Sequence, residues 1–374
     1  MRIGFDAKRA FMNSSGLGNY ARTLMKSLID HFPDNEYFAF TPGLKAELGK
    51  ELLSSEKIKI VLPPQIMQGF LSSWWRSSLV SEDIRSRNLD VYHGLSNELP
   101  KRIPFSTKKI VTIHDLIFLR HPEWYPIIDR NIYYKKFRHA CKTADAVVAV
   151  SEQTKKDVIY YFNIPEEKIK VIYQSCGDHF THRATDQEKK QFREKRDLPE
   201  KYILYVGTIE ERKNLLTLVR SLATVPDIAL VVIGKKKKYF DEVNAFVNAN
   251  HLQQRIIYPD NVDESELKLY YQNAAVFVYP SRYEGFGIPV IEALSSGTPV
   301  ITSSVSALPE AGGSGTLYIN PDDADELAQK INMVLGDTVL REKMIRDGYE
   351  HVKKFQPKEI AAQMMALYKD NKEG

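Results

Sequence analysis

Residues 276–294 read VFVYPSRYEGFGIPVIEAL, and this stretch decides the fold. The apolar run Val276–Tyr279 predicts a buried strand, and a polar turn with Gly285 and Gly287 follows it. The pair Ile288-Pro289 marks the expected start of a helix, because proline suits the first helical turn. A continuously apolar strand that leads through a glycine-rich turn into a helix is typical of a parallel sheet covered by helices on both faces.

The same alternation of short apolar runs and longer amphipathic segments continues along the chain. At roughly 100–200 residues per domain, a chain of this length favours two domains. We therefore predict an α/β fold with two doubly wound, Rossmann-like parallel-sheet domains. The expected strands are Ile3–Asp6, Tyr37–Phe40, Ile58–Leu62, Val91–His93, Ile110–His114, Ala146–Val150 and Val171–Tyr173, then Tyr202–Gly207, Ile228–Gly234, Arg255–Tyr258, Val276–Pro280, Pro299–Thr302 and Leu317–Ile319.

Composition narrows the class of protein. Hydrophobic residues make up 43% of the chain and charged residues 27%, which is ordinary for a globular protein. Cys141 and Cys176 are too few for a disulfide framework and belong to no metal-ligand pattern, so a reducing cytosol is expected. The N-terminal stretch lacks the apolar core of a signal peptide, and no apolar run approaches the ~18 residues of a membrane span. We therefore expect a cytoplasmic protein.

Positive charge is concentrated in the first half. Lys and Arg outnumber Asp and Glu by 26 to 20 over residues 1–180 and by 10 to 4 over residues 99–150. This excess is too small to indicate nucleic-acid binding. The aromatic and basic segment 120–142, and more weakly Trp74-Trp75-Arg76, are candidates for contact with a lipid-linked acceptor or with the inner face of a membrane. A solvated helix face with buried Tyr and Phe is an equally simple interpretation.

Two carboxylates flank the expected helix start after Tyr279. Glu284 lies in the loop and Glu292 just inside the helix. A helix N-terminus favours negative charge by a few tenths to ~1 kcal/mol, so both should stay ionised. Ionised carboxylates only accept hydrogen bonds, and the vicinal hydroxyls of a ribose or hexose are natural partners. A capped helix start with two acidic residues is the simpler alternative.

Two cations follow the first strand of the second half. Arg212 and Lys213 lie in a polar turn between the strand Tyr202–Gly207 and an amphipathic helix over Leu215–Leu222. Such a pair suits a diphosphate, because Arg gives bidentate hydrogen bonds and Lys a point charge. Taken alone, the pair would more simply be a solvated turn. Ligands of open parallel sheets bind beyond the carboxyl ends of the strands, so this turn should open onto the same edge as Glu284.

Two features of the first half also follow strands. Residues 6–18 are expected to form a loop whose Gly16 and Gly18 lie at the N-terminus of a helix beginning at Asn19, a ready anion site. The spacing from Gly16 fits a dinucleotide fingerprint only in part, because about ten residues separate it from the strand, and a dehydrogenase is discounted. His114 ends another strand, where it is suited to contact a sugar; a structural histidine bonded to backbone is the alternative.

Together these motifs resemble glycosyltransferase family 4 along nearly the whole chain. The matching pieces are GLGNY at 16–20, His114-Asp115, ADAVVAVS at 144–151, VGT at 206–208 with RKN at 212–214, YPSRYEGFG at 279–287, GTPVI at 297–301 and the pair Glu284-x7-Glu292. The residues of these motifs are similar to those of the bacterial mannosyltransferase-like branch of the family. The resemblance implies the GT-B fold, in which two Rossmann-like domains face a central cleft, and a retaining transfer.

The resemblance also implies roles for the residues. Glu292 would bind the nucleotide ribose, Glu284 the donor sugar hydroxyls, and Arg212 and Lys213 the diphosphate. The catalytic set would be His114, Glu284, Arg212 and Lys213, and the donor site would include Gly16, Gly18, Gly285, Phe286, Gly287 and Ile288. Two departures stand out: Thr208 replaces an Arg of many members, a role that Arg212 would take, and Gln174-Ser-Cys176-Gly replaces an Asn-Gly turn.

By the same resemblance, residues 1–180 would form an acceptor-binding domain on which a helix over 357–374 packs back, 181–199 a linker, and 200–356 the nucleotide-sugar-binding domain. The expected reaction transfers a hexose, first of all mannose from GDP-mannose, to a glycan or lipid-linked acceptor in surface polysaccharide or lipopolysaccharide assembly. A UDP-hexose donor, a nucleotide-sugar epimerase of this architecture and a nucleotide-sugar-binding scaffold are the alternatives. We expect no required cofactor or metal.

Overall fold

The structure is a computed structural model, and it describes residues 1–45, 47–67, 69, 74–225 and 227–370. The chain divides into two compact units, Met1–Ser175 with Phe355–Gly374, and Cys176–Lys354. The expected linker therefore differs from the observed division, because residues 176–199 belong to the second unit. There, α9 (Asp186–Lys195) begins with a capping box between Thr185 and Glu188 and is tied to α12 (Glu264–Asn273) by Arg193, whose guanidinium donates to Asn273 at 2.6 Å.

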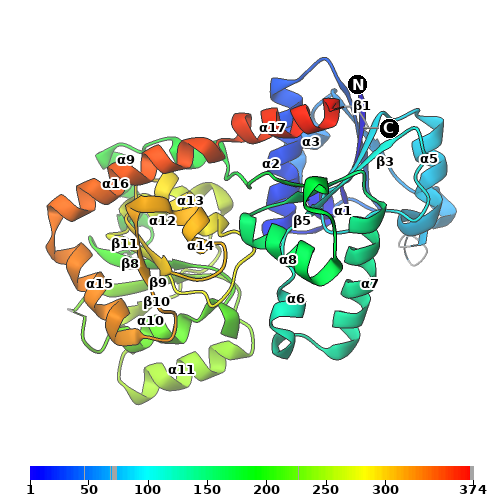
Figure 1. Ribbon diagram of the computed structural model, residues 1–374. Helices are drawn as coiled ribbons and strands as arrows, with labels where there is room; N and C mark the ends of the chain where they lie inside the picture. The colour runs from blue at the N-terminus through cyan, green and yellow to red at the C-terminus, as the bar shows by residue number, and fades with distance from the viewer. Residues whose placement is uncertain (46, 68, 70–73, 226, 371–374) are drawn as a thin grey trace. The chain divides into compact units, whose positions relative to one another are not determined.

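The N-terminal unit is built on a parallel sheet of seven strands in the order β3-β2-β1-β4-β5-β6-β7 (Figure 1). Its last strand is displaced by two residues from the expected one and spans Ile169–Val171. The other strands are β1 (Arg2–Asp6), β2 (Glu36–Phe40), β3 (Ile58–Val61), β4 (Val91–Gly94), β5 (Lys108–Ile113) and β6 (Ala146–Ala149), and the helices are α1 (Lys8–Met12), α2 (Gly16–His31), α3 (Lys50–Leu53), α5 (Val80–Ser86), α6 (Ile117–Arg120), α7 (Ile127–Thr143), α8 (Glu152–Phe162) and α17 (Pro357–Lys369).

Alternate residues of this sheet enter two different hydrophobic cores. Ile110 packs with side chains of α1, α2, α3 and α17 on one face, and Val111 with side chains of α5, α7 and α8 on the other. Successive strand residues point to opposite faces, so strands that are apolar at every position need helices on both sides. This is the doubly wound arrangement that the sequence predicts.

The C-terminal end of the chain completes the first of these cores. Helix α17 contacts α2 in the N-terminal unit, and Ser27 donates a hydrogen bond of 2.8 Å to the carbonyl of Pro357 (Figure 1). Met364 and Met365 are buried in the same core as Ile3 and Phe5. The helix expected over the last residues thus packs on the N-terminal sheet, and a proline occupies its first turn.

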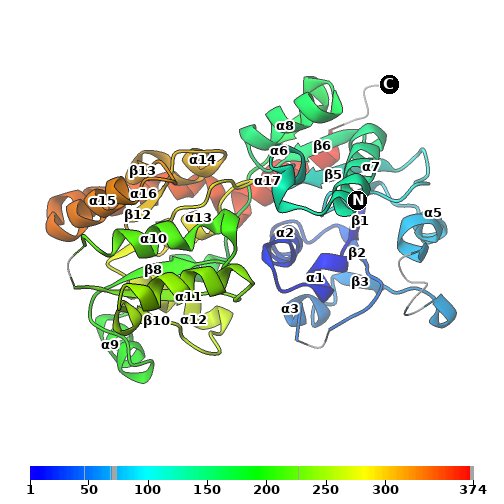
Figure 2. The same ribbon diagram turned by 90° about the horizontal axis from the view of Figure 1, so that it is seen from below.

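The second unit is a parallel sheet of six strands in the order β10-β9-β8-β11-β12-β13. Helices α10 and α11 lie side by side on one face and share a core with α15 (Figure 2). The strands are β8 (Tyr202–Val206), β9 (Ala229–Ile233), β10 (Ile256–Ile257), β11 (Val276–Tyr279), β12 (Val300–Ser303) and β13 (Thr316–Ile319). Besides α9 and α12, the helices are α10 (Leu215–Ser221), α11 (Tyr239–Ala249), α13 (Ile288–Ser295), α14 (Leu308–Gly312), α15 (Ala324–Gly336) and α16 (Thr338–Val352).

Each sheet has one point where the strand order reverses. In the N-terminal sheet it lies between β1 and β4, and in the C-terminal sheet between β8 and β11. At such a point the loops leaving the two neighbouring strands diverge to opposite faces, which opens a crevice at the carboxyl ends of the strands. The polar residues that follow β1, β4, β8 and β11 are therefore the ones placed to meet ligands.

Candidate functional site

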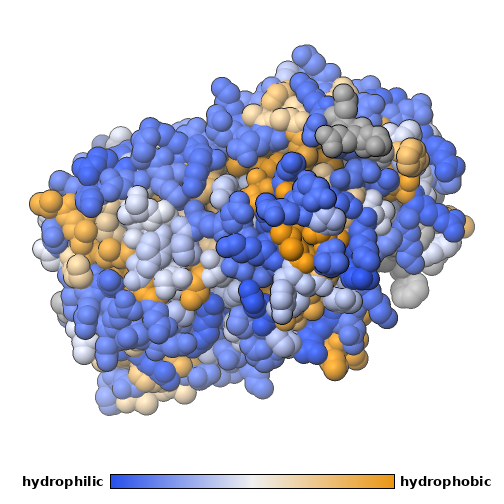
Figure 3. Space-filling view, viewed as in Figure 1, coloured by the Kyte–Doolittle hydropathy of each residue, from blue (hydrophilic) through white to orange (hydrophobic). Residues whose placement is uncertain are grey.

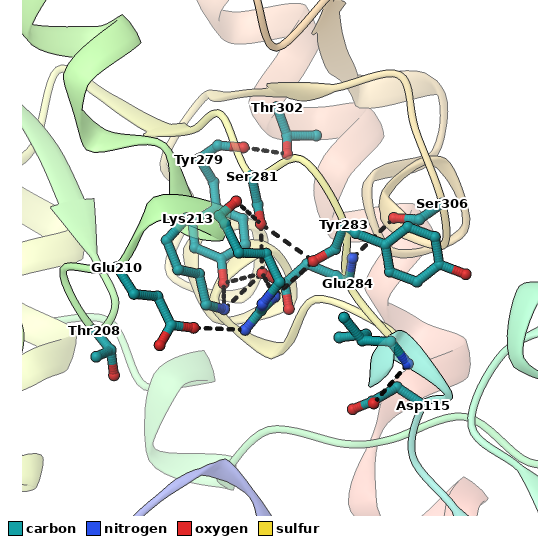
Figure 4. Close-up of polar contacts among 12 residues, drawn as sticks. Asp115, Thr208, Glu210, Lys213, Tyr279, Ser281, Tyr283, Glu284, Thr302 and Ser306 are labelled. Carbon is teal, nitrogen blue, oxygen red and sulfur yellow. Dashed lines mark hydrogen bonds and ion pairs between the residues drawn. The ribbon is translucent and has the colours of Figure 1, made fainter. Parts of the chain in front are cut away.

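Glu284 is the centre of a polar cluster at the reversal point of the C-terminal sheet. The loop after β11 carries this residue, and the turn after β8 carries Arg212 and Lys213 (Figure 4). Lys213 Nζ lies 2.6 Å and Arg212 Nη1 2.9 Å from Glu284 Oε1. The structure thus brings together the acidic and basic residues that the sequence placed at one sheet edge.

Every hydrogen bond and ion pair of the Glu284 carboxylate reaches the same oxygen. Besides the two cations, Ser281 Oγ donates to Oε1 at 2.7 Å and the Tyr279 hydroxyl donates at 2.9 Å. Among the described residues, none makes a hydrogen bond or ion pair with Oε2. Burial alone would raise the pKa of Glu284, but Arg212 and Lys213 lower it to about 2. The residue is therefore an ionised acceptor with one oxygen saturated by protein donors.

The two cations are held by further contacts. Arg212 also donates to the Tyr283 carbonyl at 2.6 Å and pairs with Glu210 at 2.9 Å, and Lys213 Nζ also donates to the Tyr279 hydroxyl. Their side chains are only 16% and 14% exposed, so neither is part of a solvated turn. The simpler interpretation of the Arg-Lys pair is therefore wrong for this chain.

Several residues of this cluster stood in the quoted motifs but were given no role there. Asn214, at φ 57°, turns the chain into α10, and its amide donates to the Pro280 and Pro321 carbonyls at 3.1 and 2.6 Å. It thereby joins the turn after β8 to the loop after β11. Tyr279 and Ser281 lie in the stretch 276–294. Their contacts with Glu284 could not be predicted, because they depend on how the loops after β8 and β11 meet.

Glu292 lies apart from Glu284, inside α13. It is 8% exposed, and its Oε2 accepts a hydrogen bond of 2.9 Å from the Tyr271 hydroxyl of α12. Burial and the nearby Glu292 raise the pKa of Tyr271 well above its ordinary value, so this hydroxyl stays a donor. On the same helix, Ser295 Oγ lies 3.5 Å from the Cys176 thiol, which belongs to the unusual Gln174–Gly177 turn.

The glycine-rich loop lies between β11 and α13, as expected. Gly287 adopts φ 127°, a conformation that favours glycine, immediately before the helix begins at Ile288. Phe286 is only 2% exposed, so its side chain belongs to the core and its backbone is what a ligand would meet. With Gly285, these residues connect the Glu284 loop to the helix that carries Glu292.

Gly16 and Gly18 correct an expectation. The sequence predicts a loop over residues 6–18, whereas α1 occupies Lys8–Met12 and both glycines lie in the first turn of α2. The helix begins directly after Ser15, which is extended, so the two glycines do not shift its start to Asn19. A Cβ on Gly18 would lie 1.9 Å from the Asn13 carbonyl oxygen, whereas one on Gly16 would meet nothing within 4 Å. Gly18 thus permits a close backbone approach.

His114 follows β5 in the N-terminal unit and is 5% exposed. Its Nε2 donates to the Leu95 carbonyl at 2.8 Å, so its Nδ1 is the acceptor of the Gln174 amide at 2.7 Å. Burial lowers its pKa to about 4, which keeps the ring neutral near pH 7. The ring is therefore fixed in one tautomer and packs edge-on against Tyr20, at 4.7 Å between ring centres. Gln174 was noted in the sequence only as part of a departure from the family pattern, and nothing there indicated that it bonds His114.

The aromatic and basic segment 120–142 divides between core and surface. Tyr133 and Phe137 of α7 stack within a buried cluster, whereas Ile127 and Ile128 at its start are 64% and 69% exposed. Hydrophobic atoms are visible at that end of α7 in Figure 3. Trp75 is buried and donates to Asp83 at 3.0 Å, and Trp74 is 52% exposed.

The described residues show neither a metal-binding cluster nor a membrane-spanning helix. Within the described ranges, no group of three or more His, Cys, Asp or Glu side chains is placed to hold a metal ion. Nor does any helix in those ranges combine the length and apolar character of a membrane span.

Two Rossmann-like units, each with polar residues at the reversal point of its sheet, define the GT-B class of α/β proteins. Known proteins agree with that class. The model described as "Glycosyltransferase Family 4" matches residues 14–175, and the one described as "Glycosyl transferases group 1" matches residues 186–351. The O-antigen chain mannosyltransferase B of Escherichia coli is 30% identical over 285 residues, which cover 75% of this chain and 74% of that protein.

The chain therefore belongs to glycosyltransferase family 4, in its mannosyltransferase-like branch, and is a glycosyltransferase. A second relative, the O-antigen chain mannosyltransferase RfbU of Salmonella typhimurium, is 31% identical over 59% of either chain. Among solved structures, a glycosyltransferase from Rickettsia africae ESF-5 matches with a TM-score of 0.76 and 20% identity over 98% of this chain and 97% of that one. HepE of Anabaena, in complex with UDP and glucose, matches with a TM-score of 0.77 and 17% identity over 98% and 99%.

Proposed function

We propose that this chain transfers a hexose from a nucleotide sugar to a hydroxyl of a glycan or lipid-linked acceptor, with retention of configuration. The observation that carries the proposal is the Glu284 carboxylate, whose Oε1 is saturated by protein donors while no described residue bonds Oε2. An ionised acceptor of this kind, beside two cations, suits a ligand that bears both hydroxyls and phosphates.

In this proposal the C-terminal unit binds the donor. Glu284 Oε2 accepts hydroxyls of the sugar, Glu292 accepts the ribose hydroxyls, and Arg212 and Lys213 bind the diphosphate. The backbone of residues 285–288 borders the same ligand. Support comes from the reversal point of the sheet, where the loops after β8 and β11 meet. The N-terminal unit is assigned to the acceptor, and its Gly16 and Gly18 to the donor phosphates and the reacting centre.

The chemical step needs no protein nucleophile. The bond between the sugar C1 and the phosphate oxygen breaks, and its electron pair leaves with the diphosphate, where Arg212 and Lys213 stabilise the developing charge. The acceptor oxygen bonds to C1 on the same face, and its proton passes to the departing phosphate oxygen. Holding the two reactants at short distance supplies the remaining catalysis. Because both ring nitrogens of His114 have protein partners, a hydrogen bond from its ring to the donor sugar requires one of them, the Leu95 carbonyl or the Gln174 amide, to be displaced.

Mannose from GDP-mannose is the proposed donor, and assembly of a surface polysaccharide is the proposed setting. Both follow from the names of the two bacterial relatives, which are O-antigen chain mannosyltransferases. A UDP-hexose remains the second candidate, because the Anabaena structure contains UDP and glucose. We also propose that the protein works in the cytoplasm.

A thermal-shift panel of nucleotide sugars tests the donor. A ligand stabilises the folded state by RT ln(1 + [L]/Kd), about 2.7 kcal/mol at a hundredfold excess over Kd, so the true donor should raise Tm most. Glu292→Ala should abolish that shift or raise the donor KM. Wild-type binding and turnover in this variant would contradict the assigned roles. Donor incubated without acceptor should not isomerise, which separates a transferase from an epimerase, and turnover with acceptor separates it from a scaffold.

A further inference from the structure

A second polar site lies at the reversal point of the N-terminal sheet. It is a pocket of about 400 Å³ whose walls come from the end of β1 and the segment after it, from the segment after β4, from α7 and from Arg76 in the helical turn Trp75–Leu79. This is the crevice that a parallel sheet opens where its strand order reverses. The lining residues are Asp6, Lys8, Arg9, Arg76, Glu98, Leu99, Pro100, Lys101, Tyr133, Lys135, Lys136 and His139.

The two carboxylates of this pocket are already paired. Arg76, whose side chain is 13% exposed, lies 2.8 Å from Asp6 and also pairs with Glu98. Lys136 lies 3.2 Å from the other oxygen of Glu98. Asp6 and Glu98 thus hold a buried guanidinium in the wall and offset only part of the positive charge of the pocket.

Four further cations line the pocket without a counterion among the described residues. In the part of the chain that the structure describes, the side chains of Lys8, Arg9, Lys101 and Lys135 make no ion pair or hydrogen bond. With Arg76 and Lys136, the lining therefore has six cations against two carboxylates, a formal excess of four. Burial lowers the pKa of Lys8, and the neighbouring charges of Arg76 and Arg9 lower it further. Crowded like charges of this kind are stabilised when an anion binds among them.

We propose that this pocket binds the phosphate or diphosphate group of the acceptor. A diphosphate carries several negative charges and matches the excess of cations, whereas a single carboxylate would leave most of it uncompensated. The pocket lies wholly in the N-terminal unit, while the cluster around Glu284 lies in the C-terminal unit. The inference rests on the proposed function, because it names the substrate class that the N-terminal unit accepts: a saccharide carried on a phosphate or diphosphate ester.

Hydrogen exchange followed by mass spectrometry tests the pocket without any turnover. Inorganic pyrophosphate should slow exchange in the peptides that contain α1 and α7 in the wild type. The double variant Lys8→Gln/Lys135→Gln should need at least tenfold more pyrophosphate for the same protection. Lys142→Gln is the matched control, because Lys142 is an exposed lysine of α7 outside the pocket, and it should behave like the wild type. Equal protection in all three proteins would overturn the proposal. Peptides over 211–213 report pyrophosphate at the donor cluster separately.

Kinetics distinguish this inference from the proposed function. With a diphosphate-linked acceptor, Lys8→Gln/Lys135→Gln should raise the acceptor KM about tenfold, which corresponds to about 1.4 kcal/mol, and leave the donor KM unchanged. With the same glycan lacking phosphate, wild type and variant should be equal. An unchanged acceptor KM would overturn the pocket but leave the transferase intact. Absence of transfer with every nucleotide sugar would contradict the proposed function, while the exchange experiment would still test the pocket.

A lipid surface is the other source of phosphate groups. Vesicles of phosphatidylglycerol should bind wild type and double variant equally, since the proposed ligand is the acceptor and not the bilayer. Loss of vesicle binding in the variant, with unchanged protection by pyrophosphate, would assign the lysines to the membrane surface and overturn the proposal.

Discussion

Lys213 Nζ lies 2.6 Å from Glu284 Oε1, so a cation proposed for phosphate is paired with the carboxylate proposed for hydroxyls. The two proposed roles are therefore coupled. A phosphate that draws Lys213 or Arg212 away weakens the pairing of Oε1, and a hydroxyl on Oε2 leaves that pairing in place. Because the cluster is largely buried, each such exchange acts at low dielectric, where charged hydrogen bonds contribute most.

Glu284→Gln should nearly abolish transfer. Glutamine keeps the shape of the side chain but removes the charge that holds two cations and accepts hydroxyls. Hydrogen bonds to a charged group contribute about 1.5–3 kcal/mol, so donor kcat/KM should fall roughly 10- to 150-fold for each one lost. Steady-state kinetics with the donor identified by thermal shift measures this effect.

Glu210→Gln is the matched control for that variant. Glu210 also pairs with Arg212, at 2.9 Å, but it lies on the other side of the guanidinium and pairs with Lys237 as well. Its loss should cost less than tenfold in kcat/KM. A larger loss for Glu210→Gln than for Glu284→Gln would show that the cluster acts through Arg212 and not through a carboxylate that binds hydroxyls.

The two glycines of α2 should respond differently to alanine. Gly18→Ala forces a Cβ to within 1.9 Å of the Asn13 carbonyl oxygen, and overpacking of this kind costs about 1–3 kcal/mol. Gly16→Ala meets no atom within 4 Å and gains helix propensity, so it should be neutral or stabilising by up to about 1 kcal/mol. Denaturant unfolding followed by tryptophan fluorescence measures both, because Trp74, Trp75 and Trp124 all lie in the N-terminal unit.

Activity separates packing from binding at these glycines. If Gly16 borders the donor phosphates, Gly16→Ala should lower transfer even though its stability is unchanged. Wild-type kinetics in Gly16→Ala would remove Gly16 from the proposed site. A stable Gly18→Ala would contradict the close approach of α2 to Asn13.

Two buried histidines should make the N-terminal unit sensitive to mild acid. Burial lowers the pKa of His114 to about 4, and burial with the nearby His114 lowers that of His93 to about 3. In the unfolded chain both titrate near 6.5, so between these values the unfolded state binds more protons and stability falls as pH falls. From pH 7 to pH 5 the loss should be about 2 kcal/mol for each histidine.

The tryptophan signal measures this loss, and His93→Gln is its control. His93 lies between the Tyr368 hydroxyl at 2.7 Å and Thr112 Oγ1 at 2.8 Å, and glutamine offers similar hydrogen bonds. Whatever its stability at pH 7, the variant should lose only about half as much free energy of unfolding as the wild type between pH 7 and pH 5. An identical pH dependence in both proteins would contradict the prediction. It would mean that His93 is protonated at pH 5 in the folded state as well as in the unfolded state.

More of the structure could be predicted from residues 276–294 than from the rest of the chain. An apolar strand, a glycine turn and Pro289 have strong local preferences, so β11 and the start of α13 at Ile288 follow from them. Arg212 and Glu284 could be placed at one edge because parallel strands all end there. No local rule predicts the distance between their side chains, however, and the ion pair could be recognised only from that distance in the structure.

What the sequence missed depends on contacts between distant segments. Gln174 bonds His114 across 60 residues, and Tyr271 bonds Glu292 across 21, and neither partner differs in type from many other polar residues. The start of α2 was missed for the opposite reason. Local propensity argues against glycine in a helix, yet both glycines lie in the first turn of α2, where the nearby Asn13 carbonyl leaves no room for a Cβ on Gly18.

Tyr271→Phe should weaken nucleotide binding, and its neighbour supplies the control. The Tyr271 hydroxyl donates to Glu292 Oε2 at 2.9 Å, whereas the adjacent buried Tyr270 hydroxyl makes no hydrogen bond with any residue that the structure describes. Removing the first takes a donor from a buried carboxylate and should cost about 1–3 kcal/mol, while Tyr270→Phe removes an unsatisfied group and should be neutral or stabilising. Calorimetric unfolding measures stability, and donor titration should show about tenfold weaker binding for Tyr271→Phe alone if Glu292 holds the ribose. A loss of stability with unchanged donor affinity would leave Glu292 a structural residue of α13.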